Sequence, residues 1–468
     1  MNASRMTGKG LEPYVPSADM PWNYQRAAHL LRRSQMGAPR HKVLELLSLT
    51  PTQAVNQLVS ETLAQPAFEY PVMAPDEDNP DRRITERWIA FLMRAGMREK
   101  MALFWSNLLI ASLNGYNEAY YFDYLSLLRD NALGNYKTLV TELGLNTAMI
   151  EYLDMDGSHK DGPNENYARE LLELFTMSPL NKDGQPNYSE IDIQEIARAF
   201  TGWRRTDGVV GFTASRFDDG EKTVFGQTGN WGYHDILDII FSERTAEIAG
   251  YVCGKLYEFF VYETPEQSVV DDMALTFIQS NFDIIPVLQQ LFTSTHFYES
   301  NIIGAKIKSP SEAVLGFMNE IGRGFTEEGE AEQLNTTRNR IQYLGQPLGM
   351  PPDVFGWPEH DAWISVQSLP SRWDTSAGIV YANDGFPDFD PIPLARSIDD
   401  HNDPYALVDG LVETVLAVGP GEYSNEQLTE ILLDGIPTYE WNIEIDEATS
   451  RLQAFLAFLT NLPEHQLI

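Results

Sequence analysis

The chain has 468 residues and a formal net charge of −35, and 43% of its residues are hydrophobic. This acidity argues against binding to nucleic acid or to an anionic membrane surface, because both interactions depend on clustered lysine and arginine. We also expect no membrane insertion, because no stretch approaches the ~18 consecutive apolar residues of a membrane-spanning helix.

The N-terminal residues, MNASRMTGKGLEPYVP, lack the apolar core of a signal peptide. Their composition predicts a cytoplasmic protein. The alternative is an exported protein whose signal has been removed or is supplied by a partner.

Helical patterns dominate the chain from residue 23 onward. The first of them ends at Gly37, and in the next one Thr50 and Gln53 form a capping-box pattern around a proline at the first helical position. Longer helical patterns follow at about 82–142, 245–262, 268–297 and 310–322. The sequence therefore predicts a mainly α fold, a large multi-helix globule with long irregular loops and at most a small β-hairpin. That hairpin would pair the segments 207–217 and 221–226.

Composition divides the chain into four segments. The stretch from Asp374 to Pro404 is rich in proline, glycine and aspartate, which is typical of a long loop. We therefore expect an N-terminal extension at 1–22, a main helical domain at 23–370, an Asp/Pro-rich loop at 371–404, and a C-terminal helical subdomain at 405–468 packed on the main domain.

The stretch PNENYARELLELF, from Pro163 to Phe175, separates apolar and charged residues cleanly. With Asn164 as the N-cap, a helix turning about 100° per residue places its apolar side chains on one face. The other face then carries the polar residues Glu165, Asn166, Arg169, Glu170 and Glu173. As a solvated ladder they would contribute a few tenths of a kcal/mol per pair. Alternatively, Arg169 holds the carboxylates in a cleft, where they act as acid and base or bind a cation.

A second amphipathic helix is expected after Ser189, which can cap it together with Asp192, and it would end at Gly202 before Trp203. Packing of the two helices would bring Arg198, with Arg204 and Arg205, toward the acidic face. Four residues are therefore expected to serve structure or partner binding rather than chemistry: Asn164, Asn166, Arg198 and Trp203.

The segment YLDMDGSHKDGPNEN, just before this helix, has the composition of a calcium-binding loop. Asp154, Asp156 and Asp161 would supply carboxylates, and Glu165 lies at the spacing that closes an EF-hand loop. The glycine falls at the fourth position rather than the sixth, however, and Lys160 intrudes. A polar turn is the favoured interpretation, with a calcium site as the alternative.

Several segments, in chain order, resemble one bacterial family of unknown function, the domain-of-unknown-function family numbered eighteen hundred. They are LLRDNALGNYKTLV, PNENYARELLELFTM, DIQEIARAFTGW, EKTVFGQTG and LGQPLGMPPDVFGWPEHDAWIS. The resemblance covers nearly the whole chain and implies a single family-wide unit. It also implies a companion protein from a sulfatase-like family, and it assigns no reaction.

The chain departs from the family pattern at three positions. Where relatives carry a Trp-His-Asn-His run, this sequence has Ser106 and Leu108 in the histidine places, and Phe217 stands at a further histidine position. A set of such histidines would suit a transition metal. If the family has such a site, we expect this member to have lost it.

Two functions remain open. The favoured one is a helical assembly or accessory protein that binds a protein partner or itself, with the sulfatase-like companion as one candidate. It rests on the missing histidines, the high aromatic content and the long Asp/Pro-rich segment. The alternative is a hydrolase that uses the carboxylate–arginine cluster, with or without a divalent cation such as calcium. In that case Glu165 or Glu170 would be the general base, and Arg169 would stabilise developing negative charge.

Overall fold

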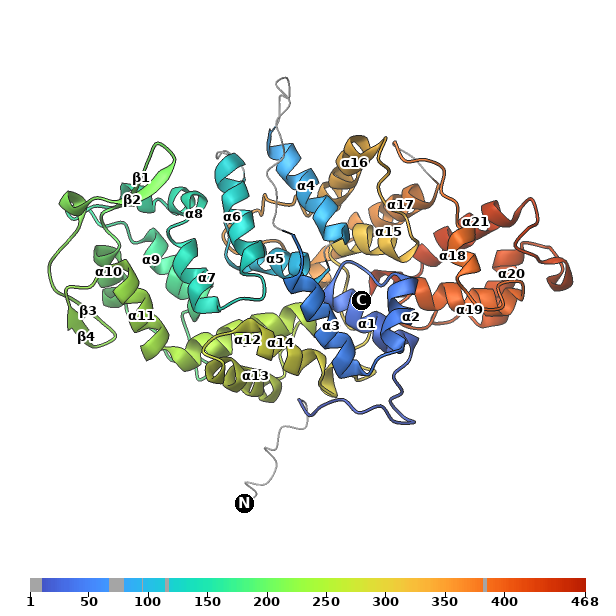
Figure 1. The fold of residues 1–468 in the computed structure, drawn as a ribbon, viewed down its shortest axis with the longest axis horizontal. Helices are drawn as coiled ribbons and strands as arrows, with labels where there is room; N and C mark the ends of the chain where they lie inside the picture. The colour runs from blue at the N-terminus through green and yellow to red at the C-terminus, as the bar shows by residue number, and fades with distance from the viewer. Residues whose placement is uncertain (1–10, 67–79, 95, 114–117, 382–384) are drawn as a thin grey trace, which may run out of the picture.

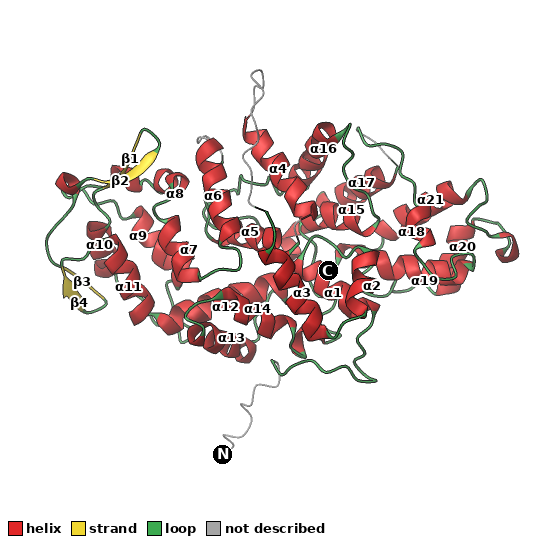
Figure 2. Ribbon diagram, viewed as in Figure 1, coloured by secondary structure: helices red, strands yellow, loops and turns green. Residues whose placement is uncertain are grey.

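The structure is a computed structural model that describes residues 11–66, 80–94, 96–113, 118–381 and 385–468. Nearly all of its regular structure is helical, and the strands are confined to one end of the molecule (Figure 2). The predicted mainly α fold is therefore confirmed. Within these ranges, no helix combines the length and the apolarity that a membrane crossing requires.

Ten helices precede the strands in the described part of the chain. They are α1 (Tyr24–Ser34), α2 (Arg40–Leu47), α3 (Pro51–Leu63), α4 (Pro80–Arg94), α5 (Met97–Leu108), α6 (Glu118–Asp130), α7 (Tyr136–Leu143), α8 (Thr147–Tyr152), α9 (Asn166–Glu170) and α10 (Glu190–Ala199). The two predicted capping boxes are confirmed: Thr50 accepts a hydrogen bond from the Gln53 amide, and Ser189 accepts one from the Asp192 amide.

The remaining helices follow the strands. They are α11 (Tyr233–Glu243), α12 (Thr245–Phe260), α13 (Gln267–Gln279), α14 (Ile284–Phe292), α15 (Phe317–Glu320), α16 (Glu330–Tyr343), α17 (Ser368–Val380), α18 (Ile392–Arg396), α19 (Pro404–Val415), α20 (Asn425–Leu433) and α21 (Ala448–Thr460). Two segments are wound as π-helix, η2 (Leu171–Thr176) and η5 (Glu312–Gly316).

The strands form two separate antiparallel hairpins. β1 (Trp203–Thr206) pairs with β2 (Val209–Phe212), and β3 (Lys222–Val224) pairs with β4 (Gln227–Gly229). The predicted pairing of 207–217 with 221–226 is therefore wrong, because each of these segments pairs with its own immediate neighbour across a two-residue turn.

The helices build an elongated body. α1 to α3 lie near its middle, the two hairpins lie at one end, and α19 to α21 lie at the other (Figure 1). A buried arginine on α1 ties the last helices to this centre. Arg32 forms an ion pair with Glu320 at 2.6 Å and donates hydrogen bonds to the carbonyl oxygens of Thr414 and Leu416.

The segment 371–404, expected to be a loop, contains most of α17 and all of α18. Pro370 sits in the first turn of α17, where a missing backbone N–H costs no helical hydrogen bond. Beyond it, Arg372, Ser376, Ile379 and Val380 recur at helical spacing and are buried. Burial of these residues along one face stabilises α17, although the proline, glycine and aspartate content of the whole segment favours a loop.

Candidate functional site

Within the predicted stretch the helix begins at Asn166 and runs without a break to Thr176, and its winding changes halfway. α9 passes directly into the π-helical η2, which the Thr176 hydroxyl closes by donating to the carbonyl oxygen of Leu171 at 2.6 Å. The predicted apolar face is buried, except that Leu174 is only partly buried. A π-helical turn holds more residues than an α-helical turn, so the direction of each successive side chain shifts. Leu174, within η2, therefore no longer lies on the buried face.

Asn164 and Asn166 organise the start of this helix. The Asn164 side chain accepts a hydrogen bond from the Asn166 amide at 2.9 Å and donates one to the carbonyl oxygen of Asp154. Asn166 donates to the carbonyl oxygen of Leu153 at 3.4 Å. Asn164 thus bonds a helical amide as a cap does, although α9 itself begins two residues later.

The predicted charged face is an ion-pair network at the protein surface. Arg169 lies 3.3 Å from Glu165 and 3.8 Å from Glu173, and it donates two hydrogen bonds to Glu190 at the start of α10. The Arg169 side chain is 33% exposed, and that of Glu190 is 68% exposed. The hydrogen bonds to Glu190 raise the pKa of Arg169, and the same contact lowers the pKa of Glu190.

The other predicted partners of this face lie elsewhere. Arg198 pairs with Glu195 and Asp218, each at 2.8 Å, and its hydrogen bond lowers the pKa of Asp218. Trp203 packs edge-on against the ring of Phe212. Arg198 therefore pairs with carboxylates outside the acidic face, whereas Arg205 lines the same hollow as Glu165 of that face.

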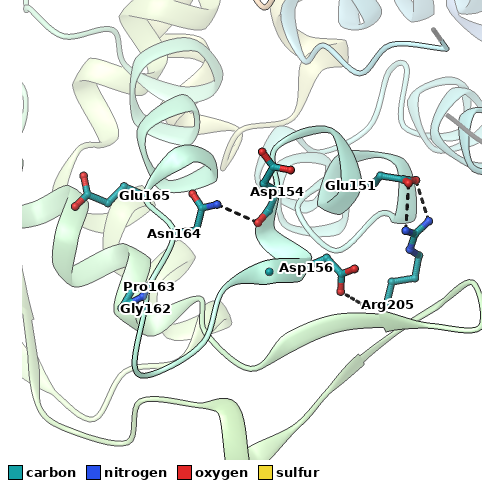
Figure 3. Close-up of a pocket in the computed structure, with 9 residues that line it drawn as sticks. Glu151, Asp154, Asp156, Gly162, Pro163, Asn164, Glu165 and Arg205 are labelled. Carbon is teal, nitrogen blue, oxygen red and sulfur yellow. Dashed lines mark hydrogen bonds and ion pairs between the residues drawn. The ribbon is translucent and has the colours of Figure 1, made fainter. Parts of the chain in front are cut away.

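An acidic hollow of about 770 Å³ lies beside the start of α9 (Figure 3). It is lined by Glu151, Asp154, Asp156, Gly157, Gly162, Pro163, Asn164, Glu165 and Arg205. Arg205 of β1 donates from its guanidinium to both oxygens of Glu151, at 2.8 and 3.1 Å, and its backbone N–H donates to Asp156 at 2.7 Å. One arginine thus engages two of the four carboxylates of the hollow.

The three aspartates of the calcium-type loop do not form a joint ligand set. Asp154 and Asp156 line the acidic hollow, whereas Asp161 lies outside it in the turn between His159 and Gly162. Asp156 is turned toward β1 by its hydrogen bond to Arg205 (Figure 3). Across the described residues, no three acidic, histidine or cysteine side chains are grouped so that they could hold a metal ion.

The positions at which the family resemblance implies histidine lie in two different parts of the fold. Ser106 is buried in α5 and donates to the carbonyl oxygen of Leu103, and Leu108 lines a cavity at the end of the same helix. Phe217 instead packs against Phe212 of β2, at the hairpin end of the molecule.

One concave surface was not predicted from the sequence. We call it the apolar groove. It has a volume of about 620 Å³ and runs between α12, α13 and the segment 177–187. Its apolar wall contains Leu180 and Leu275, which are both 54% exposed. The local signal for it was the pair Gly250 and Gly254, one turn apart on α12, where an added Cβ atom meets no other atom within 4 Å.

Comparison with known proteins gives one match. The model of the family DUF1800, described as a protein of unknown function, matches residues 29–467. No curated protein and no solved structure matches the chain.

Proposed function

The chain belongs to the DUF1800 family, and from that premise we propose that it is a helical accessory protein that binds a partner protein through the apolar groove. The observation that carries this proposal is the groove itself. Solvent-exposed leucines line a concavity between two packed helices, and exposed apolar surface of this kind is typical of a protein-binding site.

The shape of the groove favours a helix as its occupant. Gly250 and Gly254 leave a flat strip on α12, while Ala274, Leu275 and Ile278 of α13 form the opposite wall. A partner helix could lay its apolar face into such a channel, with its backbone approaching the glycines closely.

Charge favours a different protein over a second copy of this chain. The groove is bordered by Glu247, Asp183 and Asp271, and Lys182 lies 3.9 Å from Asp271. An excess of carboxylates suits a partner segment flanked by lysine or arginine. Two copies of a chain with net charge −35 would repel each other. The sulfatase-like companion implied by the family resemblance is the first candidate partner.

Replacing Gly250 with tryptophan is expected to abolish partner binding, because the indole would occupy the groove, and to leave the fold intact, because a Cβ added at this position meets no atom within 4 Å. Gly250→Ala is the matched control, because a methyl group leaves most of the groove open. A photo-crosslinking residue placed at position 275 identifies the occupant of the groove in lysate of the native host. In the otherwise unchanged protein and in Gly250→Ala it should crosslink to one partner protein, at a helix flanked by lysine or arginine. In Gly250→Trp this crosslink should be absent. Crosslinks only to other copies of this chain, or equal crosslinks in all three proteins, would contradict the proposal.

The second candidate, a hydrolase at the carboxylate–arginine cluster, has one observation in its favour. Burial raises the pKa of Glu170, Glu173 raises it further, and Arg169 opposes them only in part. A carboxyl group with a raised pKa beside an arginine suits general acid–base chemistry.

If this candidate is right, Glu170→Gln should lower turnover by about 10²–10⁴-fold, the usual contribution of a general acid or base. The measurement is hydrolysis of nitrophenyl acetate, phosphate, sulfate and glucoside, with Glu440→Gln as a control on a distant surface. Absence of turnover by the wild-type protein, or equal turnover by both variants, would rule the hydrolase out for these substrates.

A further inference from the structure

The segment 463–468, which follows α21, is held near the middle of the elongated body by backbone pairing with the segment 306–308 (Figure 1). The Lys308 amide donates to the carbonyl oxygen of Gln466 at 2.8 Å. The Ile468 amide donates to the carbonyl oxygen of Lys306 at 2.8 Å, and the Lys306 amide donates back to Ile468 at 3.4 Å. We call the segment 463–468 the latch.

His465 of the latch is buried without a hydrogen bond. Its side chain is 1% exposed, and the imidazole packs edge-on against the ring of Phe317 at a centroid distance of 5.1 Å. No side chain or backbone group in the described part of the chain bonds to either ring nitrogen. A neutral imidazole tolerates such a site far better than an imidazolium does, because the charged form loses much more hydration free energy on burial.

Three cations from three different elements oppose a positive charge on His465. They are Lys308 of the paired segment, Arg32 of α1 and Arg372 of α17. Arg372 spans the pairing, because it donates to the carbonyl oxygen of Lys308 at 2.8 Å and to the side-chain oxygen of Gln466 at 3.4 Å. Burial lowers the pKa of Lys308 only to about 8, so this lysine is charged throughout the acidic range.

The carboxylates on the neighbouring elements are engaged by other groups. Glu320 of α15 pairs with Arg32 at 2.6 Å, and Glu312 of η5 pairs with Lys100. Glu464, although adjacent to His465 in sequence, lies beside Gly421. Within the described residues, no acidic side chain forms an ion pair with His465. A protonated His465 would therefore lack a counter-ion while the latch is closed.

Burial, together with the charges of Lys308, Arg32 and Arg372, holds the pKa of His465 well below its ordinary value of 6.5. When the latch is open the imidazole is hydrated, so its pKa returns to about 6.5. The open form then binds a proton that the closed form does not bind. Acid must therefore shift the equilibrium toward the open form, with the closed form fully stable only above about pH 6.5.

We propose that the segment 463–468 is an acid-sensitive latch, which is closed while His465 is neutral and opens when His465 is protonated. Opening breaks the contact of Arg372 with Gln466, so it also releases one tie of α17. It uncovers Lys308 and Arg372, two buried cations in a chain whose net charge is −35. The latch does not depend on the apolar groove, which lies on other helices.

Hydrogen exchange of the full chain measures the opening. The reporters are the amides of Lys308 and Ile468, whose hydrogen bonds hold the latch. After correction for the pH dependence of intrinsic exchange, their protection should fall about thirtyfold between pH 7.5 and pH 5, because opening binds one proton with a pKa of about 6.5. Amides within α12 should keep their protection, because the opening is local.

His465→Leu removes the titrating group, so the protection of both reporter amides should change by no more than about twofold over this pH range. His465→Gln, which is also uncharged at every pH, gives the same test if His465→Leu does not fold. His41→Gln is the matched control, because His41 is an exposed histidine on α2, and this variant should show the full loss.

The latch is disproved if the reporter amides of the wild-type protein are equally protected at pH 7.5 and pH 5. A loss of protection in the His465 variants as large as in the wild type would also disprove it. If the amides of α12 lost protection in parallel with the reporters, acid would be unfolding the whole protein rather than opening the latch, and the proposal would fail.

Discussion

Replacing Glu99 with glutamine is expected to lower the free energy of unfolding by about 3–5 kcal/mol, the usual cost of breaking a buried ion pair from one side. Glu99 of α5 and Arg129 of α6 are both fully buried, and a guanidinium N–H lies 2.6 Å from the carboxylate. The indole of Trp88 donates to the second carboxylate oxygen at 3.1 Å. Glutamine keeps the shape of the side chain but removes the negative charge that faces the Arg129 guanidinium.

Urea unfolding measured by circular dichroism provides the test. Glu61→Gln is the control, because Glu61 pairs with Lys42 at 3.3 Å on the surface and both side chains are more than a third exposed. The control should change stability by no more than about 1 kcal/mol. A loss for Glu99→Gln as small as that of the control would show that the buried pair contributes little.

Replacing Glu99 and Arg129 together by apolar residues should cost less stability than replacing Glu99 alone. Burial raises the pKa of Glu99, while Arg129 acts to lower it, so desolvation offsets much of the attraction between the two charges. The double variant Glu99→Leu/Arg129→Met should therefore recover part of the stability lost in Glu99→Gln, because an apolar pair carries no desolvation cost but leaves the buried Trp88 indole N–H without its acceptor.

The helices were largely predictable because their signals are local. A capping box such as that of Thr50 acts within one turn, so the sequence contains the whole interaction. The first hairpin also had a local signal, since Asp207 and Gly208 occupy a two-residue turn with positive φ at both positions. The second hairpin turns at Phe225 with φ +50°, a conformation that a phenylalanine gives no reason to expect.

The contacts of the candidate sites also divide into local ones, which the sequence predicts, and contacts between distant segments, which it does not. The pairs of Arg169 with Glu165 and Glu173 follow from helical spacing and could be predicted. Its contact with Glu190 depends on how α9 and α10 meet, which no spacing encodes. The hydrogen bond from the Trp357 amide to the Asn107 side chain could not be predicted from local patterns either, because the two residues are 250 positions apart in sequence.

Glu312 of η5 is expected to make the stability of the protein sensitive to acid. Burial alone would raise its pKa, but Lys100 and Lys306, together with hydrogen bonds from Lys100 and from the Ser309 amide, outweigh burial and lower the pKa to about 2. Relative to an unfolded value of 4.5, this difference corresponds to about 3 kcal/mol of stability at neutral pH.

The direction of the effect follows from the lowered pKa. The folded protein holds Glu312 charged more strongly than the unfolded chain does, so the stabilisation is fully present above about pH 4.5 and is lost as the pH falls toward 2. Glu312→Gln should therefore cost about 3 kcal/mol at pH 7 but only about 1 kcal/mol at pH 3. Urea unfolding of both proteins at the two pH values measures this difference.

Glu444→Gln serves as the control for this titration. Glu444 pairs with Arg396 at 2.6 Å, but both side chains are more than half exposed, so the substitution should change stability by no more than about 1 kcal/mol at either pH. If the cost of Glu312→Gln were the same at pH 3 and pH 7, the buried lysines would not be holding its carboxylate in the charged form. Lys100 would then retain its position through packing alone, although its side chain is only 1% exposed and Glu312 is its ion-pair partner.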